Sequence, residues 1–150
     1  MKNINNKNAF IIGTAQLGQK YGIANTSNLT SKHLTQVFIE EASTLNLNSF
    51  DTASSYGNSE SLIGNGIKNL NKEITIYTKI SKLKNKNILE AKKEFGKSLK
   101  KLKLSNIEGL LLHNPSDWNI KGMKEFSVYL RKSKIINKFG LSIYEKKQIP

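Results

Sequence analysis

Five mainly apolar runs of strand length recur along the chain, separated by longer stretches with a different pattern. A run of four to eight such residues between polar ones is typical of a strand buried in a parallel sheet. The runs predict strands at residues 9–13, 47–51, 74–80, 107–113 and 138–143.

The stretches between these runs carry apolar residues at three- and four-residue steps, the period of a helix with one buried face. They predict helices over residues 31–45, 59–70, 88–102 and 120–131. The first begins at Ser31, a residue type that caps helix N-termini. It then repeats Leu34, Val37, Phe38, Ala42 and Leu45. Strands that alternate with helices indicate right-handed βαβ units and a parallel sheet.

Two parallel folds accommodate five strands and four helices. A flavodoxin-like, doubly wound α/β sheet would be complete in 150 residues, as one domain spanning 1–150, whereas an eight-fold barrel needs ~250. Length alone favours the doubly wound sheet. The residues EKKQIP after the fifth run resemble the opening of another helix. This ending favours instead a chain cut off within a larger fold.

The net charge of +13 raises a nucleic-acid-binding function as one hypothesis, because a basic surface attracts phosphate. The basic residues are scattered, and the sequence has neither a zinc-finger spacing nor an aromatic RNA-binding motif. The densest cluster, residues 92–104, has the pattern of an amphipathic helix with lysines on its solvated face. We expect no nucleic-acid partner, and a basic nucleic-acid-binding protein remains an alternative.

The sequence contains no cysteine and only two histidines, His33 and His113. These counts exclude disulfides, thiolate catalysis and a zinc site made of cysteine and histidine. No apolar run approaches the ~20 residues that span a bilayer, and AFIIG is too short for a signal-peptide core. We therefore expect a cytoplasmic protein without a metal and without a membrane partner.

Polar side chains follow the predicted strands at the ends where parallel α/β folds place their sites. In chain order they are Gly13 and Thr14, then Asp51 with Tyr56 on its loop, then Lys79, His113 and Ser142. Each has an ordinary explanation by itself, such as turn chemistry for the acid or a solvated strand end for the lysine. Parallel strands end at one edge, so these groups are expected to lie together. Ser59 and Glu60 are expected to cap the helix that follows.

These four groups together suit one mechanism, in which the tyrosine acts as general acid toward a carbonyl oxygen. The groups are an acid, a phenol, an amine and an imidazole. An unperturbed tyrosine has a pKa near 10, and an ammonium ~4 Å away supplies roughly the ~4 kcal/mol needed to bring it near neutrality. Lys79 could provide that charge, and Asp51 would orient Lys79. His113 could hydrogen-bond the substrate carbonyl.

The loop GTAQLGQKYG, which begins at Gly13, also invites comparison with phosphate-binding loops. Gly13 and Gly18 have the glycine spacing of a P-loop, which requires Lys and then Ser or Thr directly afterwards. Gln19, Lys20 and Tyr21 follow instead, and the dinucleotide pattern G-x-G-x-x-G is absent. The sequence therefore predicts neither a P-loop nor a Rossmann fingerprint.

In order along the chain, these motifs resemble the N-terminal part of an aldo/keto reductase. FDTASSYGNSE resembles the family signature D-T-A-x-x-Y-G-x-S-E, TKI its lysine strand, LLHNP its histidine strand and FGLSIY its G-V-S-N-F strand. The resemblance implies a catalytic tetrad of Asp51, Tyr56, Lys79 and His113, with Tyr56 as proton donor. It also implies a (β/α)₈ TIM barrel, truncated here after the fifth strand, in place of the doubly wound sheet.

The resemblance further implies reduction of a small aldehyde or ketone by NADPH, less often NADH. It puts Gly13, Thr14 and Asp51 beside the nicotinamide and Ser142 at its carboxamide. Two features depart from the family. Ile143 replaces an asparagine that contacts the carboxamide, and the eight residues before the first strand are too few for the usual barrel-bottom hairpin.

Strands six to eight, with the segments that grip the rest of the cofactor, would lie beyond Pro150. A five-strand piece would leave sheet edges and an apolar interior open. We therefore expect self-association, negligible NADPH affinity and no turnover from the 150-residue chain alone. Such a chain would be a fragment, a truncated gene product or a half-barrel that pairs with another. A non-catalytic, reductase-like scaffold that binds partners or senses nucleotide is the second alternative.

Overall fold

The computed structural model describes residues 10–19 and 31–149. Its strands are β1 (Ile12–Gly13), β2 (Ser49–Asp51), β3 (Thr75–Ile80), β4 (Ile107–Leu112) and β5 (Ile136–Leu141). Its α-helices are α1 (Ala15–Gly18), α2 (Lys32–Thr44), α3 (Ser59–Gly66), α4 (Ile88–Leu102) and α5 (Met123–Lys132). Short 3₁₀ helices are η1 (Ile67–Asn69), η2 (Pro115–Asn119) and η3 (Lys146–Gln148).

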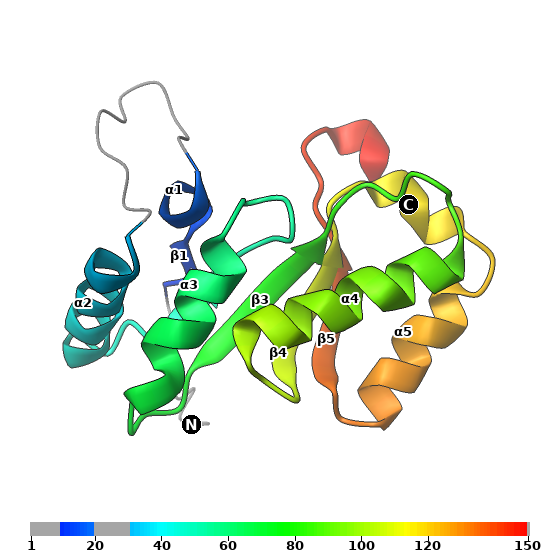
Figure 1. Cartoon of the computed structure of the whole chain (residues 1–150). Helices are drawn as coiled ribbons and strands as arrows, with labels where there is room; N and C mark the ends of the chain where they lie inside the picture. Colours follow the sequence, from blue (N-terminus) through cyan, green and yellow to red (C-terminus); the bar gives the residue numbers. More distant parts are fainter. Residues whose placement is uncertain (1–9, 20–30, 150) are drawn as a thin grey trace, which may run out of the picture.

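The strands form one parallel sheet in the order β1-β2-β3-β4-β5, so each strand pairs with the next one in the chain. Helices α3, α4 and α5 lie on the same side of this sheet (Figure 1). A doubly wound sheet instead reverses its strand order at a switch point and has helices on both faces. Neither feature occurs within the described ranges. The doubly wound alternative is wrong, and the sheet is the open arc of five barrel units.

The core lies between the sheet and its helices. Because side chains alternate along a strand, one set of strand residues points toward the helices and the other set toward the opposite face. The strand side of the core consists of Phe50, Ile76, Ile80, Leu110, Leu112 and Ile136, all at most 1% exposed. The helix side includes Ile63, Ala91, Phe95, Leu102, Met123, Phe126 and Leu130. Burial of each Ile, Leu, Met or Phe side chain in this core contributes roughly 1.5–3 kcal/mol.

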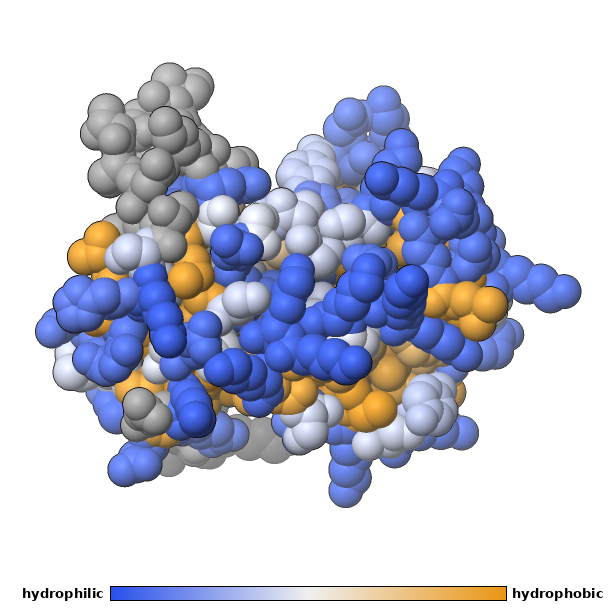
Figure 2. Space-filling view, viewed as in Figure 1, coloured by the Kyte–Doolittle hydropathy of each residue, from blue (hydrophilic) through white to orange (hydrophobic). Residues whose placement is uncertain are grey.

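Helix α4 has the predicted boundaries, and its first turn is capped by the side chain of Asn87, which accepts from the backbone N of Glu90. Its inner face buries Phe95 and Leu102, whereas its outer face exposes lysines 92, 93, 97 and 100. Figure 2 shows mainly hydrophilic residues on the surface that this helix helps to form. The prediction of an amphipathic helix with a solvated lysine face is confirmed.

The other helices differ from prediction at their ends. Helix α2 begins after Ser31, whose side chain accepts from the backbone N of Leu34, so this predicted cap is confirmed. The helix predicted over 59–70 ends at Gly66 and continues as η1. The helix predicted over 120–131 begins only at Met123, because Gly122 has a φ of 88°, outside the helical region.

The buried face of α2 also differs from its apolar repeat. Leu34, Val37 and Leu45 are exposed, and the buried positions are Thr35, Ile39, Ala42 and Ser43. Helix α2 packs against α3, where Gly66 lies beneath the side chain of Ile39. A Cβ atom on Gly66 would come within 2.6 Å of Ile39 Cδ1, so the end of the Ile39 side chain would have to shift to admit it.

Among the strands, the fifth and the first differ most from prediction. The fifth strand was expected over 138–143 but spans Ile136–Leu141, because Ile136 already pairs with Ile107 and Ser142 lies past the strand end. Strand β1 pairs only through Ile12 and Gly13. Ala9 and the segment before it lie outside the described residues, as do Lys20, Tyr21 and Pro150.

Candidate active site

Lys79 and Asp51 form an ion pair at the ends of two neighbouring strands. Nζ of Lys79, at the end of β3, donates to Oδ2 of Asp51, at the end of β2. The same nitrogen lies 3.3 Å from the backbone oxygen of Thr52. Lys79 is only 6% exposed, and a buried charge is costly unless it is paired. Asp51 therefore supplies the counter-charge that this buried ammonium group requires.

Tyr56 lies directly beside this ion pair. Nζ of Lys79 is 5.3 Å from the centre of the Tyr56 ring. The Tyr56 ring in turn meets the imidazole of His113 edge to face, with ring centres 6.1 Å apart at 88°. The structure thus brings together the four side chains that the sequence predicted at the strand ends.

Both ring nitrogens of His113 have hydroxyl partners. Nδ1 lies 3.2 Å from Oγ of Ser55, on the same loop as Tyr56, and Nε2 lies 3.3 Å from the Tyr144 hydroxyl. Burial holds the pKa of His113 below its ordinary value, and the positive charge of Lys79 lowers it further, against the opposing charge of Asp51. The ring is therefore neutral at pH 7, with one nitrogen as donor and the other as acceptor.

In a titration followed by NMR, we expect His113 to take up its proton below the ordinary histidine pKa of about 6.5. The unfolded chain then binds this proton at higher pH than the folded chain, so the free energy of unfolding falls as the pH drops below about 6.5. Lys79→Met removes a nearby positive charge and should raise the His113 pKa. A pKa of 6.5 or above in the unmodified protein would contradict this prediction.

A buried hydroxyl network fixes the loop that carries Tyr56. Thr14 donates from its backbone N and from Oγ1 to the backbone oxygen of Asp51, at 3.0 and 2.9 Å. Oγ of Ser59 lies 2.9 Å from both oxygens of Thr14, and Thr52 donates to Ser59 at 3.1 Å. The network ties the end of β1 to both ends of the loop. Thr14 is fully buried, so its contacts described here are with protein groups.

Glu60 has a role different from the predicted cap. The N-cap of α3 is Asn58, which makes no side-chain capping bond, and Glu60 is 1% exposed. Its Oε1 accepts from the Thr78 hydroxyl at 2.7 Å, and Nζ of Lys101 lies 3.6 Å from Oε2. Glu60 thereby joins α3 to the residue before Lys79. Ser59 and Glu60 link elements distant in sequence, so the expectation that they cap the helix is wrong.

The end of α1 lies in close contact with the Tyr56 loop. Gly57 has a φ of 54°, which favours glycine, and a Cβ there would lie 2.2 Å from the backbone oxygen of Gly18. A Cβ on Gly18 would lie 1.8 Å from the backbone oxygen of Tyr56. Two glycines therefore permit a backbone contact at the site. Nothing in the sequence pattern around Gly18 predicts this contact.

The sequence profile of the aldo/keto reductase family matches residues 9–149. The chain belongs to this family. The matched region contains all five strands and the four side chains gathered at their ends. A comparison with curated protein sequences gives no match.

Solved aldo/keto reductases share the fold at low sequence identity. One from Pseudomonas aeruginosa has a TM-score of 0.74 at 22% identity, over 88% of this chain and 54% of its own. The holo form of a Bacillus halodurans enzyme gives 0.70 at 22%, over 87% and 44%. A Klebsiella pneumoniae enzyme in complex with NADPH gives 0.68 at 19%, over 92% and 46%. These neighbours are TIM barrels, and the chain spans about half their length.

Of the remaining residues predicted for this aldo/keto reductase chain, Gly13 lines a hollow beside the ion pair. Ile11, Gly13, Asp51, Tyr77 and Leu111 line a space of about 330 Å³. A Cβ on Gly13 would meet nothing within 4 Å, so the backbone is open to approach there. Ser142 lies one residue past β5, where its backbone N donates to the backbone oxygen of Leu112 at 2.9 Å.

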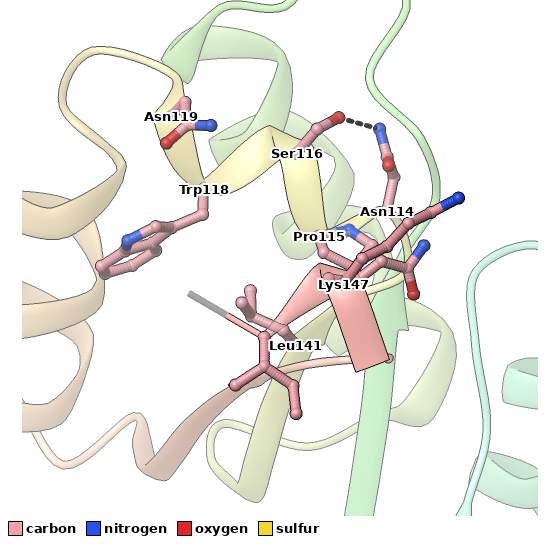
Figure 3. Close-up of a pocket in the computed structure, with 9 residues that line it drawn as sticks. Asn114, Pro115, Ser116, Trp118, Asn119, Leu141 and Lys147 are labelled. Carbon is pink, nitrogen blue, oxygen red and sulfur yellow. Dashed lines mark hydrogen bonds between the residues drawn. The ribbon is translucent and has the colours of Figure 1, made fainter. Parts of the chain in front are cut away.

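A second hollow, of about 320 Å³, lies between η2 and η3 (Figure 3). Trp118 and Leu141 border it, and Asn114 donates to Ser116 at 2.8 Å on its rim. None of the four clustered side chains lines it, so it is not the candidate site. The described residues hold no group of three or more potential metal ligands of the His, Cys, Asp and Glu types. Within the same residues, no helix is long and apolar enough to cross a membrane.

Proposed function

We propose that this chain carries the catalytic side chains of an NADPH-dependent oxidoreductase that reduces an aldehyde or a ketone. The observation that carries the proposal is the buried Lys79 ammonium group, paired with Asp51 and lying 5.3 Å from the centre of the Tyr56 ring. A cation in this position favours the negative charge that a phenol acquires when it gives up its proton. Such a charge arrangement suits a tyrosine that acts as general acid.

In this mechanism Tyr56 gives its phenolic proton to the carbonyl oxygen as that oxygen gains charge. Lys79 stabilises the resulting phenolate, and Asp51 holds Lys79 in place through the ion pair. His113 is neutral at pH 7, so a ring nitrogen that carries a proton can donate to the same oxygen without adding a charge. The carbonyl is thereby held between the phenol and the imidazole.

NADPH, when bound, would supply the hydride that reduces the carbonyl carbon. The hollow beside Asp51 fits a flat ring, because Gly13 presents no side chain and leaves its backbone open to approach. Gly13 and Asp51 would border the nicotinamide, with Thr14 supporting Asp51 from behind and Ser142 on the carboxamide side. NADPH is proposed over NADH because the Klebsiella pneumoniae neighbour was crystallised with NADPH.

The proposal is tested by Lys79→Met in a form of the protein that reduces carbonyls, assayed as NADPH consumption with an aldehyde substrate. We expect kcat to fall about 10- to 100-fold, because general acid catalysis contributes ~10²- to 10⁴-fold and the phenol itself remains in place. The alkaline limb of the pH–rate profile should move to higher pH, since the phenol loses the cation that favours its ionisation.

Lys97→Met is the matched control, because Lys97 is an exposed α4 residue paired only locally, with Glu94 at 2.7 Å. This variant should retain the activity and the pH–rate profile of the unmodified protein. If Lys79→Met retained full activity with an unmoved profile, the proposed mechanism would be wrong. NADPH binding without turnover in the unmodified protein would instead support a non-catalytic scaffold.

A further inference from the structure

Tyr144 contacts His113 from a segment that the proposed mechanism does not use. It lies two residues past Ser142, and its ring stacks on the imidazole with ring centres 6.4 Å apart at 20°. Its hydroxyl is 3.3 Å from Nε2 of His113. Tyr144 is nevertheless 70% exposed. An exposed aromatic ring is thus held against His113, a half-buried histidine of the candidate site.

The backbone around Tyr144 is fixed by a local hydrogen-bond motif. The backbone N of Tyr144 and that of Glu145 both donate to Oε1 of Gln148, at 2.8 and 3.0 Å. Glu145 and Gln148 form a capping box at the start of η3. A capping box satisfies backbone N–H groups at the start of a helix with side-chain acceptors. The Tyr144 side chain therefore starts from a defined position beside His113.

The hydroxyl of Tyr144 competes with any substrate for His113. A neutral imidazole has one donor and one acceptor nitrogen, and Ser55 and Tyr144 occupy the two. A carbonyl that reaches both Tyr56 and His113 must displace one of these hydroxyls. Tyr144 is 70% exposed and approaches from outside the Tyr56 loop, so its hydroxyl is the one that leaves.

We propose that Tyr144 is a specificity residue of this site: its hydroxyl occupies Nε2 of His113 in the free protein, and its ring favours carbonyl substrates with an adjacent aromatic group. The proposal rests on the proposed function. The His113 ring lies between two tyrosine rings: it meets Tyr56 edge to face and stacks on Tyr144. A substituent on a carbonyl held at His113 therefore lies beside an exposed aromatic surface, which favours an aromatic substituent.

Two substitutions separate the hydroxyl from the ring. Tyr144→Phe retains the ring and removes the competing hydrogen bond, so KM for benzaldehyde and for butanal should fall about 2- to 10-fold, by more than kcat changes. Tyr144→Leu removes the aromatic surface, so kcat/KM for benzaldehyde relative to butanal should fall up to about 10-fold. Tyr129 on α5 is 59% exposed, and Tyr129→Phe and Tyr129→Leu are the matched controls.

A measurement that needs no turnover keeps this inference distinct from the proposed function. In NMR spectra of the unliganded protein, Tyr144→Phe should shift the ring-nitrogen signals of His113, and Tyr129→Phe should leave them unmoved. Unmoved His113 signals in Tyr144→Phe would overturn the inference even in a protein that reduces carbonyls. Equal losses for benzaldehyde and butanal in Tyr144→Leu would overturn it as well. Absence of turnover with shifted signals would count against the proposed function and support the contact.

Discussion

In any form of this protein that reduces carbonyls, Tyr56→Phe will lower kcat by about 10²- to 10⁴-fold, the usual contribution of a positioned general acid. The substitution keeps the ring that packs edge to face on His113 and lies near Lys79, and it removes only the hydroxyl. Binding of NADPH should therefore change little, whereas the proton for the carbonyl oxygen must come from water. Steady-state NADPH consumption measures kcat, and fluorescence titration measures cofactor binding.

The control for this variant is Tyr129→Phe, which removes a phenol from the exposed surface of α5. It should match the unmodified protein in both assays. If Tyr56→Phe kept a near-normal kcat, Tyr56 would have no place in the mechanism. Loss of NADPH binding together with activity would point to a displaced loop instead of a missing proton donor.

Gly18→Ala will destabilise the fold by about 3 kcal/mol and displace the Tyr56 loop, because overpacking of a close contact costs ~1–3 kcal/mol or more. The added Cβ would lie 1.8 Å from the backbone oxygen of Tyr56 and 2.5 Å from the backbone N of Ser59. Both contacts are with backbone, which has no rotamer to change. The loop must therefore move as a unit, away from Thr14 and Lys79. Denaturant unfolding gives the loss of stability.

Gly96→Ala is the matched control because it makes the same chemical change where there is room. Gly96 lies within α4, and a Cβ there would meet no atom within 4 Å. Alanine has the higher helix propensity, so this variant should gain about 0.5–1 kcal/mol. Opposite signs for the two variants are the expected result. A Gly18→Ala protein as stable as the unmodified one would contradict the close backbone contact at the site.

The sequence by itself determined the elements whose pattern is local. Helix α4 has its predicted bounds because an Asn cap and one apolar stripe act within a few residues of each other. The clustering of Asp51, Lys79 and His113 was predictable for a related reason. Parallel strands all end at one edge, so a polar residue at each strand end is brought to the same place without detailed knowledge of packing.

Only the tertiary structure decided which contacts join distant elements. Strand order separated the barrel arc from the doubly wound sheet, because both use the same alternation of strand and helix. Glu60 and Ser59 have the residue types of helix caps. Their side chains instead form hydrogen bonds with Thr78 on β3 and with Thr14 after β1. The pairing of Tyr144 with His113 joins residues 31 positions apart. Such contacts depend on the paths of several strands at once, so a local pattern of apolar and polar residues does not predict them.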